Sequence, residues 1–316
     1  MPTPSSISPA ASSGASSSAF SGISHVIILH NPLSGRHSQR RLKKIITLLQ
    51  RQQVKVTDYK VYDLADIRNA TQRALSATPD LIIAAGGDGT INQIATQLCH
   101  HQIPLAVLPF GTANVLAHSL GLPTKASALA NYLLTGHAKT AHMGKIDTSL
   151  FLCMASIGVD AEVVAHMTPD IKHRWGKVAY LHGALKALLR PRYQSYQFMI
   201  DGQKHSAYGL IITNVSHYGG PYCLAPEQSL LNPGLTAVLI TAPGRRTLMR
   251  ILYDLWAGHI QKNPDITYIH CQHIDITSPH AAPIQADGDH LTAIPAAIST
   301  EPGLILWLPA HLAENK

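Results

Sequence analysis

The sequence has few aromatic residues, few charged residues and few cysteines. Of its 316 residues, 6 % are aromatic and 14 % are charged, whereas 46 % are hydrophobic, so we expect a large aliphatic core. The four cysteines are scattered and form no Cys-x-x-Cys pair. This pattern predicts neither a disulfide framework nor a zinc ribbon, and it is typical of a reducing compartment, so we expect a cytoplasmic protein.

No targeting segment or membrane span is recognisable either. Residues 1–24 contain Ser, Ala, Pro and Gly but no charged side chain, and therefore resemble neither a secretory signal nor a mitochondrial presequence. We expect residues 1–24 to be a disordered tail. The uncharged stretch from Gly89 to Thr124 is interrupted by prolines, glycines and asparagines, which excludes a single membrane helix. The sequence predicts a soluble or peripheral protein.

The net charge of +7 favours an anionic partner, which could be a nucleotide, an acidic membrane surface or a nucleic acid. Tryptophan beside arginine, as at Arg174-Trp175, is typical of an interfacial anchor. Each basic cluster is equally consistent with a solvated basic face. The clusters lie at Arg36–Lys44, Lys172–Trp175, Arg190–Arg192 and Arg245–Arg246. His270 and His273 would point to opposite faces of an extended strand, so we expect no metal site there.

The length favours two domains, and the pattern of elements changes along the chain. In residues 25–143, apolar strands alternate with helices, which predicts a Rossmann-like α/β domain with a mostly parallel sheet and helices on both faces. Strands are expected at His25–His30, Val54–Val61, Leu81–Ala85 and Leu105–Leu108, and helices around Leu42–Leu49, at Asp66–Ser76, around Ile91–Leu98 and at Val115–Leu120.

Residues 144–316 are predicted to form a β-rich domain with a few helices. The expected strands are Phe151–Met154, Gln197–Ile200, Tyr208–Thr213, Thr236–Thr241, His273–Thr277 and Leu304–Leu308, and the expected helices are Trp175–Leu189 and Thr247–Gly258.

The stretch Gly86-Gly87-Asp88-Gly89-Thr90 lies where an apolar strand leads into a helix. Open α/β sheets bind ligands at this kind of position, glycines let backbone N–H groups approach phosphate, and a helix N-terminus favours negative charge. The stretch is neither a Walker phosphate loop nor a Gly-x-Gly-x-x-Gly motif. Asp88 would repel phosphate unless it holds a metal ion or takes a proton. The alternative is a plain glycine turn with a capping aspartate.

A second loop, Leu108–Asn114, follows the next strand, and its Gly111, Thr112 and Asn114 could bind phosphate or cap a helix. Because the carboxyl ends of parallel strands share one sheet edge, the two loops should converge, and Asn31–Gly35 could join them from a third strand.

Three motifs in this order, Asn31-Pro-x-Ser-Gly35, Gly86-Gly-Asp-Gly-Thr-Ile-Asn92 and Leu108-Pro-x-Gly-Thr-x-Asn114, resemble the catalytic domain of the diacylglycerol kinase and sphingosine kinase superfamily. The resemblance extends over roughly His25 to Pro309, and within the superfamily the sequence is similar to the bacterial lipid kinase branch. The later motifs are Ile146-Asp147, Ser156-Ile-Gly158-Val-Asp160, Gly176–Tyr180, Gly219-Gly220, Ala225-Pro226 and Asp287-Gly288-Asp289.

The resemblance implies an ATP-dependent lipid kinase, with ATP and Mg²⁺ in a cleft between the α/β domain and a β-sandwich-like domain. It implies peripheral contact with a membrane, where the lipid substrate lies. Asp289 would accept the proton of the lipid hydroxyl, and Asp88 would also take part in the chemistry. The residues expected at the nucleotide are Asn31, Ser34, Gly35, Gly86, Gly87, Asp88, Gly89, Thr90, Asn92, Gly111, Thr112 and Asn114.

Two departures from the family pattern affect these expectations. The family usually has glutamate where this chain has Asp289, so the carboxylate is retained on an arm shorter by roughly 1.5 Å. Bacterial relatives commonly have an aspartate of a structural magnesium site at the position of Pro233, so we expect that site to be altered or absent.

Other functions remain possible from the sequence alone. A soluble-metabolite kinase related to NAD kinases shares the glycine loop, although the Leu108–Asn114 and Asp287–Asp289 motifs argue against it. A non-catalytic nucleotide-binding or lipid-sensing protein is the main alternative, and nucleic-acid binding rests on charge alone. The sequence does not identify the lipid, which could be diacylglycerol or a sphingoid base.

Overall fold

The computed structural model describes residues 22–35, 38–158, 161, 194–277 and 282–312. Several predicted features lie outside these residues. They are most of the tail, the helix Trp175–Leu189, the basic clusters Lys172–Trp175 and Arg190–Arg192, Arg36 of the first basic cluster, and the motif residues Asp160 and Gly176–Tyr180.

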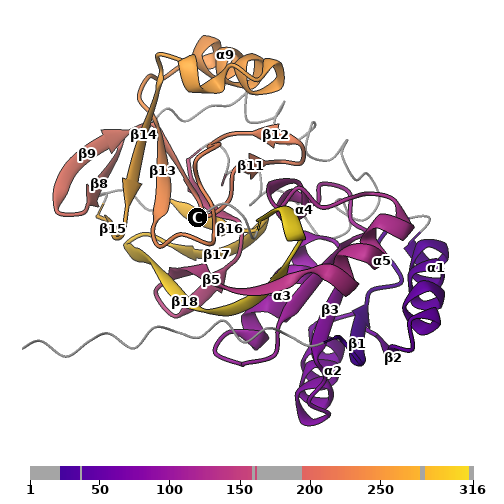
Figure 1. Ribbon diagram of the computed structural model, residues 1–316. Coiled ribbons are helices and arrows are strands. Elements are labelled where there is room, and N and C mark those ends of the chain that lie inside the picture. Colours follow the sequence, from indigo (N-terminus) through magenta and orange to yellow (C-terminus); the bar gives the residue numbers. More distant parts are fainter. Residues whose placement is uncertain (1–21, 36–37, 159–160, 162–193, 278–281, 313–316) are drawn as a thin grey trace, which may run out of the picture.

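The first half forms the predicted α/β fold (Figure 1). Four strands lie side by side in the order β2-β1-β3-β4, and every neighbouring pair is parallel. They are β1 (His25–His30), β2 (Lys55–Lys60), β3 (Leu81–Gly86) and β4 (Leu105–Pro109). The helices between them are α1 (Ser38–Arg51), α2 (Leu64–Ser76) and α3 (Asp88–Leu98), and after β4 come α4 (Val115–Ser119) and α5 (Ala126–Thr135).

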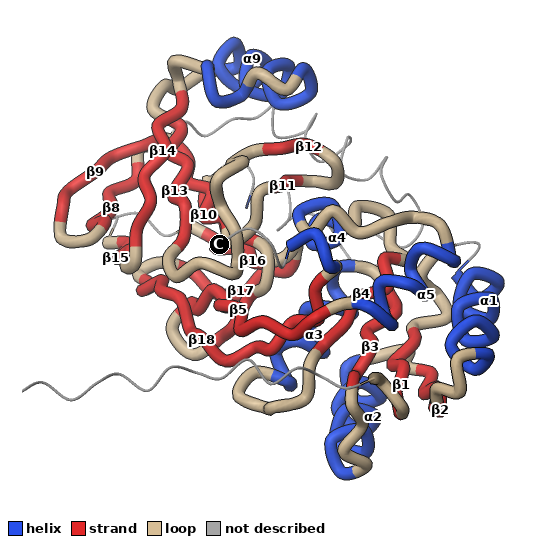
Figure 2. Tube along the Cα trace, in the orientation of Figure 1, coloured by secondary structure: helices blue, strands red, loops and turns tan. Residues whose placement is uncertain are grey.

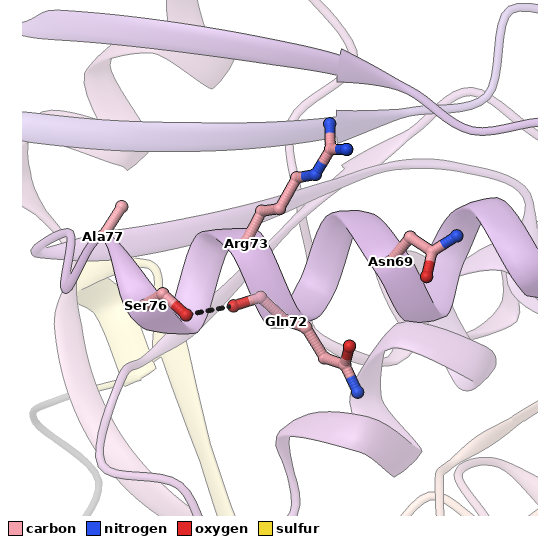
Figure 3. Close-up of a pocket in the computed structure, with 5 residues that line it drawn as sticks. All are labelled: Asn69, Gln72, Arg73, Ser76 and Ala77. Carbon is pink, nitrogen blue, oxygen red and sulfur yellow. Dashed lines mark hydrogen bonds between the residues drawn. The ribbon is translucent and has the colours of Figure 1, made fainter.

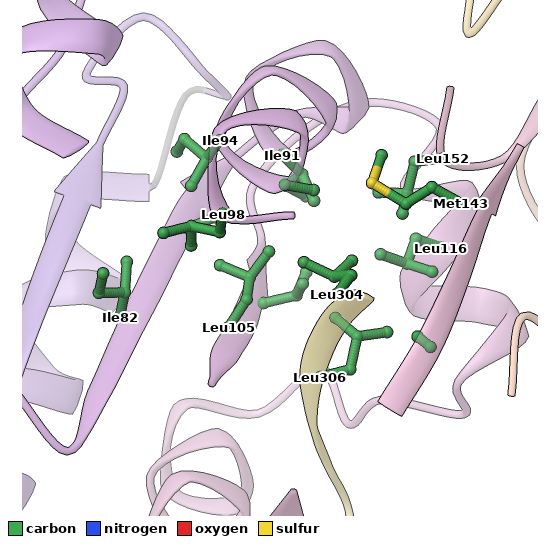
Figure 4. Close-up of a cluster of buried hydrophobic side chains, with 14 of the residues drawn as sticks. Ile82, Ile91, Ile94, Leu98, Leu105, Leu116, Met143, Leu152, Leu304 and Leu306 are labelled. Carbon is green, nitrogen blue, oxygen red and sulfur yellow. The ribbon is translucent and has the colours of Figure 1, made fainter. Parts of the chain in front are cut away.

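Alternating side chains of the strands bury themselves on opposite faces of this sheet, as strand geometry requires. On β3, Ile82 and Ala84 pack with α2 and α3, whereas Ile83 and Ala85 pack with α1 and α5. Figure 4 shows the first of these cores, where Ile82 and Leu105 meet Ile91 and Leu98 of α3. Helices therefore cover both faces, as expected for a sheet whose strands β1, β3 and β4 are apolar and buried along most of their length.

The second half is built from two sheets that pack against each other through a shared aliphatic core. One sheet has the order β14-β13-β10-β7-β16-β17, and the other continues from β4 through β18-β15-β8-β9. The strands of the second half that precede the last long strand are β6 (Ser149–Phe151), β7 (Met154–Ile157), β8 (Tyr196–Ile200), β9 (Gln203–Ala207), β10 (Gly209–Thr213), β11 (His217–Tyr218), β12 (Tyr222–Cys223), β13 (Leu235–Ile240), β14 (Ile266–Cys271), β15 (Ile274–Ile276), β16 (Pro283–Ala286) and β17 (Asp289–Ala293).

Two long strands connect the halves (Figure 2). β18 (Ala296–Leu308) pairs antiparallel with β5 (His137–Ile146) along its length, and its residue Leu306 also pairs in parallel with Leu105 of β4. Near its start, Ile298 pairs with Ile274 of β15. The last strand of the chain thus completes the first sheet and continues into the second.

The pattern missed several elements and misplaced one. The predicted strand Phe151–Met154 is wrong: β6 ends at Phe151 and β7 begins at Met154. The break has a physical cause, because the backbone N–H groups of residues 152–154 donate to the side chain of Asp287. Also missed were α5, β5, β9, β11, β12, β14, β16, β17 and the first part of β18.

One predicted helix of the second half can be compared with the structure. Thr247–Gly258 corresponds to α9 (Arg245–Ala257), and two short 3₁₀ turns follow at Ile260–Lys262 and Ala310–Leu312. Over the residues that the structure describes, no helix combines the length and the apolar character needed to cross a bilayer.

Candidate active site

The glycine-rich stretch occupies the carboxyl end of β3 and the first turn of α3. β3 ends at Gly86, and α3 begins at Asp88. The first loop joins it there, because Nδ2 of Asn31 donates to Oγ1 of Thr90 over 3.2 Å and the backbone N–H of Asn31 donates to Ala85. The predicted convergence of these two loops is therefore present in the fold.

The loop after β4 is in direct backbone contact with the glycine-rich stretch. A Cβ atom placed on Gly111 would lie 2.5 Å from Cα of Gly87, so only glycine fits there. Gly35 has a φ of +73°, and a Cβ on it would lie 2.5 Å from the carbonyl oxygen of Phe110. The three loops thus meet at one sheet edge.

Asn114 fixes the conformation of the third loop. It adopts a left-handed backbone with a φ of 50°, its Oδ1 accepts from the N–H of Gly111 at 2.8 Å, and its Nδ2 donates to the Gly111 carbonyl at 3.0 Å. The side chain is therefore engaged within its own loop, immediately before α4 begins at Val115.

The carboxylate of Asp88 faces the first backbone N–H groups of α4. Burial raises the pKa of Asp88 above its ordinary value, and the N–H groups of Leu116, Asn114 and Val115 oppose that rise. Within the described residues its Oδ1 is buried and has no hydrogen-bond partner. A buried carboxylate oxygen in this state favours a proton or a cation beside it.

A second carboxylate comes from the other half of the chain. Asp287 accepts the backbone N–H groups of Leu152, Cys153 and Met154 at 2.6, 2.9 and 3.0 Å. Burial, and to a smaller extent the negative charge of Asp88, raise the pKa of Asp287 to about 6 against these three bonds. The fold therefore brings Asp287 into the electrostatic field of Asp88.

Sequence reasoning had selected Asp289, not Asp287. Asp287 and Gly288 form the turn between β16 and β17, where the N–H of Gly288 donates to Oε1 of Gln285 at 3.0 Å. Asp289 follows as the first residue of β17, with an exposed side chain. The signal for Asp287 was present in the Asp-Gly-Asp motif, but the motif alone does not say which carboxylate is buried.

The other predicted nucleotide residues surround the same edge. Gly86, Gly87 and Thr90 belong to the contacts above, and Asn92 lies one helical turn beyond Asp88 with a buried Oδ1 that has no partner among the described residues. Ser34 and Thr112 lie on the loops and Gly89 lies in the first turn of α3, and Gly89 and Thr112 are exposed.

Magnesium would fit at Asp88. Mg²⁺ usually binds proteins through one or two carboxylates and completes its shell with water and substrate phosphate, rather than through an all-protein cage. The unpartnered Oδ1 of Asp88 suits that mode. The described residues contain no group of three or more His, Cys, Asp or Glu side chains placed to hold a metal by themselves.

A separate hollow lies on α2, lined by Asn69, Gln72, Arg73, Ser76 and Ala77 (Figure 3). α2 runs from the carboxyl end of β2 back to the amino end of β3, so these residues lie away from the edge where the loops meet. None of the predicted site residues lines this hollow, and we do not place the chemistry there.

Two family models match the chain in succession. Residues 25–146 match the diacylglycerol kinase catalytic domain, and residues 153–308 match the YegS C-terminal NAD kinase beta sandwich-like domain.

Curated relatives match over nearly their whole length. A diacylglycerol kinase of Staphylococcus carnosus is 25 % identical over 276 residues, which cover 85 % of this chain and 90 % of the relative. A diacylglycerol kinase of Mycobacterium tuberculosis is 27 % identical over 302 residues, which cover 92 % and 96 %. A solved diacylglycerol kinase structure from Bacillus anthracis shares the fold with a TM-score of 0.74 at 20 % identity, covering 93 % of this chain and 100 % of that one.

Fold, converging loops and family matches together define a class: the protein is a lipid kinase, a phosphotransferase with an alcohol group as acceptor. It belongs to the diacylglycerol kinase superfamily, in the bacterial branch with two domains of this type. The resemblance stated from the motifs is thereby confirmed.

Proposed function

We propose that the protein transfers the γ-phosphate of ATP to the hydroxyl of a membrane lipid, and that diacylglycerol is the first substrate to test because the curated relatives are diacylglycerol kinases. The main support from this chain is that residues 152–154, which bind the Asp287 carboxylate, pack in the same buried core as Ile91 of α3 and Leu116 of α4. This packing supports a position of the Asp287–Asp289 turn of the second half near the glycine-rich loop of the first half.

Phosphoryl transfer depends on alignment and charge neutralisation more than on covalent help from the protein. In our proposal the backbone N–H groups of residues 86–90 and 112–113 hold the phosphates, since glycines allow the chain to approach them closely. The contact between Gly87 and Gly111 fixes the spacing of these two donor sets.

Asp289 is our proposed general base. It begins a strand with an exposed side chain, so its carboxylate can receive the proton of an incoming hydroxyl. Asp287 is proposed as a positioning residue, because its three bonds to residues 152–154 fasten the turn that presents Asp289.

We propose that Asp88, with Asn92 one turn further along α3, provides the protein ligands for Mg²⁺. When bound, the ion supplies positive charge to the phosphate oxygens. Pro233 offers no side-chain ligand, so the expected alteration of the structural magnesium site remains a prediction. There the side chain of Gln228 donates to the Gly234 carbonyl at 3.1 Å and accepts from Thr236 at 2.7 Å.

We further propose a cytoplasmic protein that meets its substrate at a membrane surface. The alternative, a non-catalytic nucleotide-binding or lipid-sensing protein, gains no support from the family matches.

The direct test is to incubate the protein with labelled ATP, Mg²⁺ and vesicles containing diacylglycerol, a sphingoid base or another lipid alcohol. Asp88→Asn tests the site, and Asp275→Asn, an exposed aspartate on β15, is the matched control. We expect one labelled lipid from the wild type and the control, and at least a hundredfold less from Asp88→Asn.

Labelled sphingoid base instead of diacylglycerol would correct the substrate but keep the kinase. ATP binding without any labelled lipid, with or without Mg²⁺, would contradict the proposal and favour the sensing protein.

A further inference from the structure

Helix α9 has two opposite apolar faces, and only one of them is buried. Thr247, Ile251 and Leu255 face the protein, where Ile251 and Leu255 pack with Leu224 and Ile260. An ordinary surface helix buries its single apolar stripe and presents a polar one to solvent. A second apolar face on α9 therefore needs another explanation.

The outward face of α9 carries Met249, Leu252, Tyr253 and Trp256, which are 63, 47, 63 and 70 % exposed. At spacings of three and four residues they form one continuous stripe. They account for four of the eight large hydrophobic side chains exposed in the described part of the chain, so the exposure is concentrated on this helix. The rings of Tyr253 and Trp256 lie 6.2 Å apart, which joins them into one aromatic surface.

Arginines border this stripe. Arg245 and Arg246 are exposed in the first turn, and Arg250 lies one turn later, paired with Asp265. The helix has a single acidic residue, Asp254, and its carboxylate already accepts from Nδ2 of Asn263 at 2.6 Å. The exposed apolar stripe is thus edged by positive charge in a chain of net charge +7.

The helix is connected to the candidate active site through one short hairpin. β12 of the β11–β12 hairpin contacts α9, and β11 contacts α4 (Figure 1). Within that hairpin Gly220 lies against Ala113 of the third loop. A partner that contacts α9 would therefore lie on the same side of the second half as the loops of the candidate site.

We propose that α9 is the membrane-docking helix of this protein and that it lies in the interface of an anionic bilayer, with Met249, Leu252, Tyr253 and Trp256 inserted at headgroup depth. Trp and Tyr favour that depth, and arginines on the flanks bind acidic headgroups. The inference deepens the proposed function by naming the surface that meets the lipid. It takes a membrane as occupant because apolar and basic residues occur together, which a purely protein interface would not require.

The test measures vesicle binding without ATP, by flotation of the full-length protein with vesicles of phosphatidylcholine alone or mixed with phosphatidylglycerol. The variants are Leu252→Ser combined with Trp256→Ser, and Arg246→Glu. The control is Tyr62→Ser, which removes an equally exposed aromatic side chain (54 %) far from α9.

We expect the wild type to bind the anionic vesicles only, and added salt should weaken this binding. The double variant should bind them at least tenfold more weakly than the wild type, and Arg246→Glu about fivefold or more. The Tyr62→Ser control should bind like the wild type. Binding by the double variant equal to that of the wild type would overturn the proposal. So would a wild-type dimer that the double variant makes monomeric, because α9 would then be a protein interface.

Lipid phosphorylation in detergent separates this inference from the proposed function. We expect the double variant to phosphorylate detergent-dispersed lipid at the wild-type rate, because the helix is outside the reacting groups. Vesicle binding that depends on α9, with no lipid phosphorylated by any variant, would support the docking helix while contradicting the kinase.

Discussion

Two carboxylates from opposite halves of the chain interact electrostatically at the candidate active site. Asp88 begins α3, Asp287 lies in the turn between β16 and β17, and burial raises the pKa of both. Raised pKa values of interacting carboxyl groups are typical of functional sites, because the charged form has been taken out of water. At the scale of single residues, we propose that this pair and the nearby Asp289 define the site.

Replacing the proposed base should impair turnover but not nucleotide binding. For Asp289→Asn we expect a kcat lower by about 10² to 10⁴, with the Kd for ATP within about threefold of the wild type. Asp289→Glu, which restores the longer arm usual in the family, should retain activity. Turnover and equilibrium ATP binding, measured on the same preparations, check this. A kcat for Asp289→Asn near that of the wild type would exclude Asp289 as the base.

Asp287 should make stability depend on pH in a specific direction. Its folded-state pKa of about 6 lies above the ordinary value of 3.8, so the folded protein holds the proton more tightly than the unfolded chain. The resulting stabilisation, up to about 3 kcal/mol, is complete below the ordinary pKa and is lost as pH rises through about 6. As the pH rises from 4 to 7, the Tm of the wild type should therefore fall relative to the Tm of Asp287→Asn.

Thermal unfolding in a metal chelator, at several pH values, measures this difference. Asp275→Asn is the control and should follow the wild type at every pH. A Tm difference between wild type and Asp287→Asn that stays constant, or that changes in the opposite direction, would contradict a raised pKa at Asp287.

At the scale of elements, the site depends on loops that follow three neighbouring parallel strands. β1, β3 and β4 end at the same edge, and Asn31, Gly87 and Gly111 bring their loops into contact. The backbone, not a set of long side chains, provides most of the surface expected to hold phosphate. Small changes in loop spacing should therefore affect nucleotide binding.

Gly111→Ala should separate the two loops. The new methyl group would lie 2.5 Å from Cα of Gly87, a contact that forces the backbone to shift at a cost of about 1–3 kcal/mol. We expect a lower Tm and at least tenfold weaker ATP binding. Gly89→Ala is the control for stability, since no heavy atom lies within 4 Å of its added Cβ and alanine favours the first turn of α3. Equal Tm values for the two variants would contradict this account.

At the scale of the whole molecule, β18 makes the two halves interdependent. Leu304, Leu306 and Leu308 of this last strand belong to the same buried core as Ile82 and Leu105 of the first sheet. The predicted domain boundary after residue 143 stays a prediction, and β5 crosses it (His137–Ile146). We propose that the two sides of this boundary bind different substrates but do not fold independently of each other.

A fragment of residues 25–146 should fail to fold by itself. It contains β1 to β5 but lacks β18, so β4 loses a parallel neighbour and the core loses three leucines. We expect broad, poorly dispersed amide resonances from the fragment and one calorimetric transition from the full chain. A folded, monomeric fragment would show that the first half is independent of β18.

Local rules predicted the first half well and the second half only in part. Strands β1, β3 and β4 are continuous apolar runs between turn residues, and α1 to α3 have helical spacing, so their positions follow from the nearest few residues. By contrast, the strand β5 (His137–Ile146), which mixes polar and apolar residues, is stabilised by pairing with the distant strand β18, and a local pattern does not contain that information.

The sequence by itself determined the α/β architecture of the first half, the three loops at one sheet edge and the family, because glycines and apolar periods act over a few residues. Only the tertiary structure decided that Asp287 is a carboxylate of raised pKa in the electrostatic field of Asp88, that residues 152–154 interrupt a strand to bind it, and that β18 completes the first sheet. These features depend on which distant segments pack together, and burial, which sets the pKa of a carboxyl group, is a property of that packing.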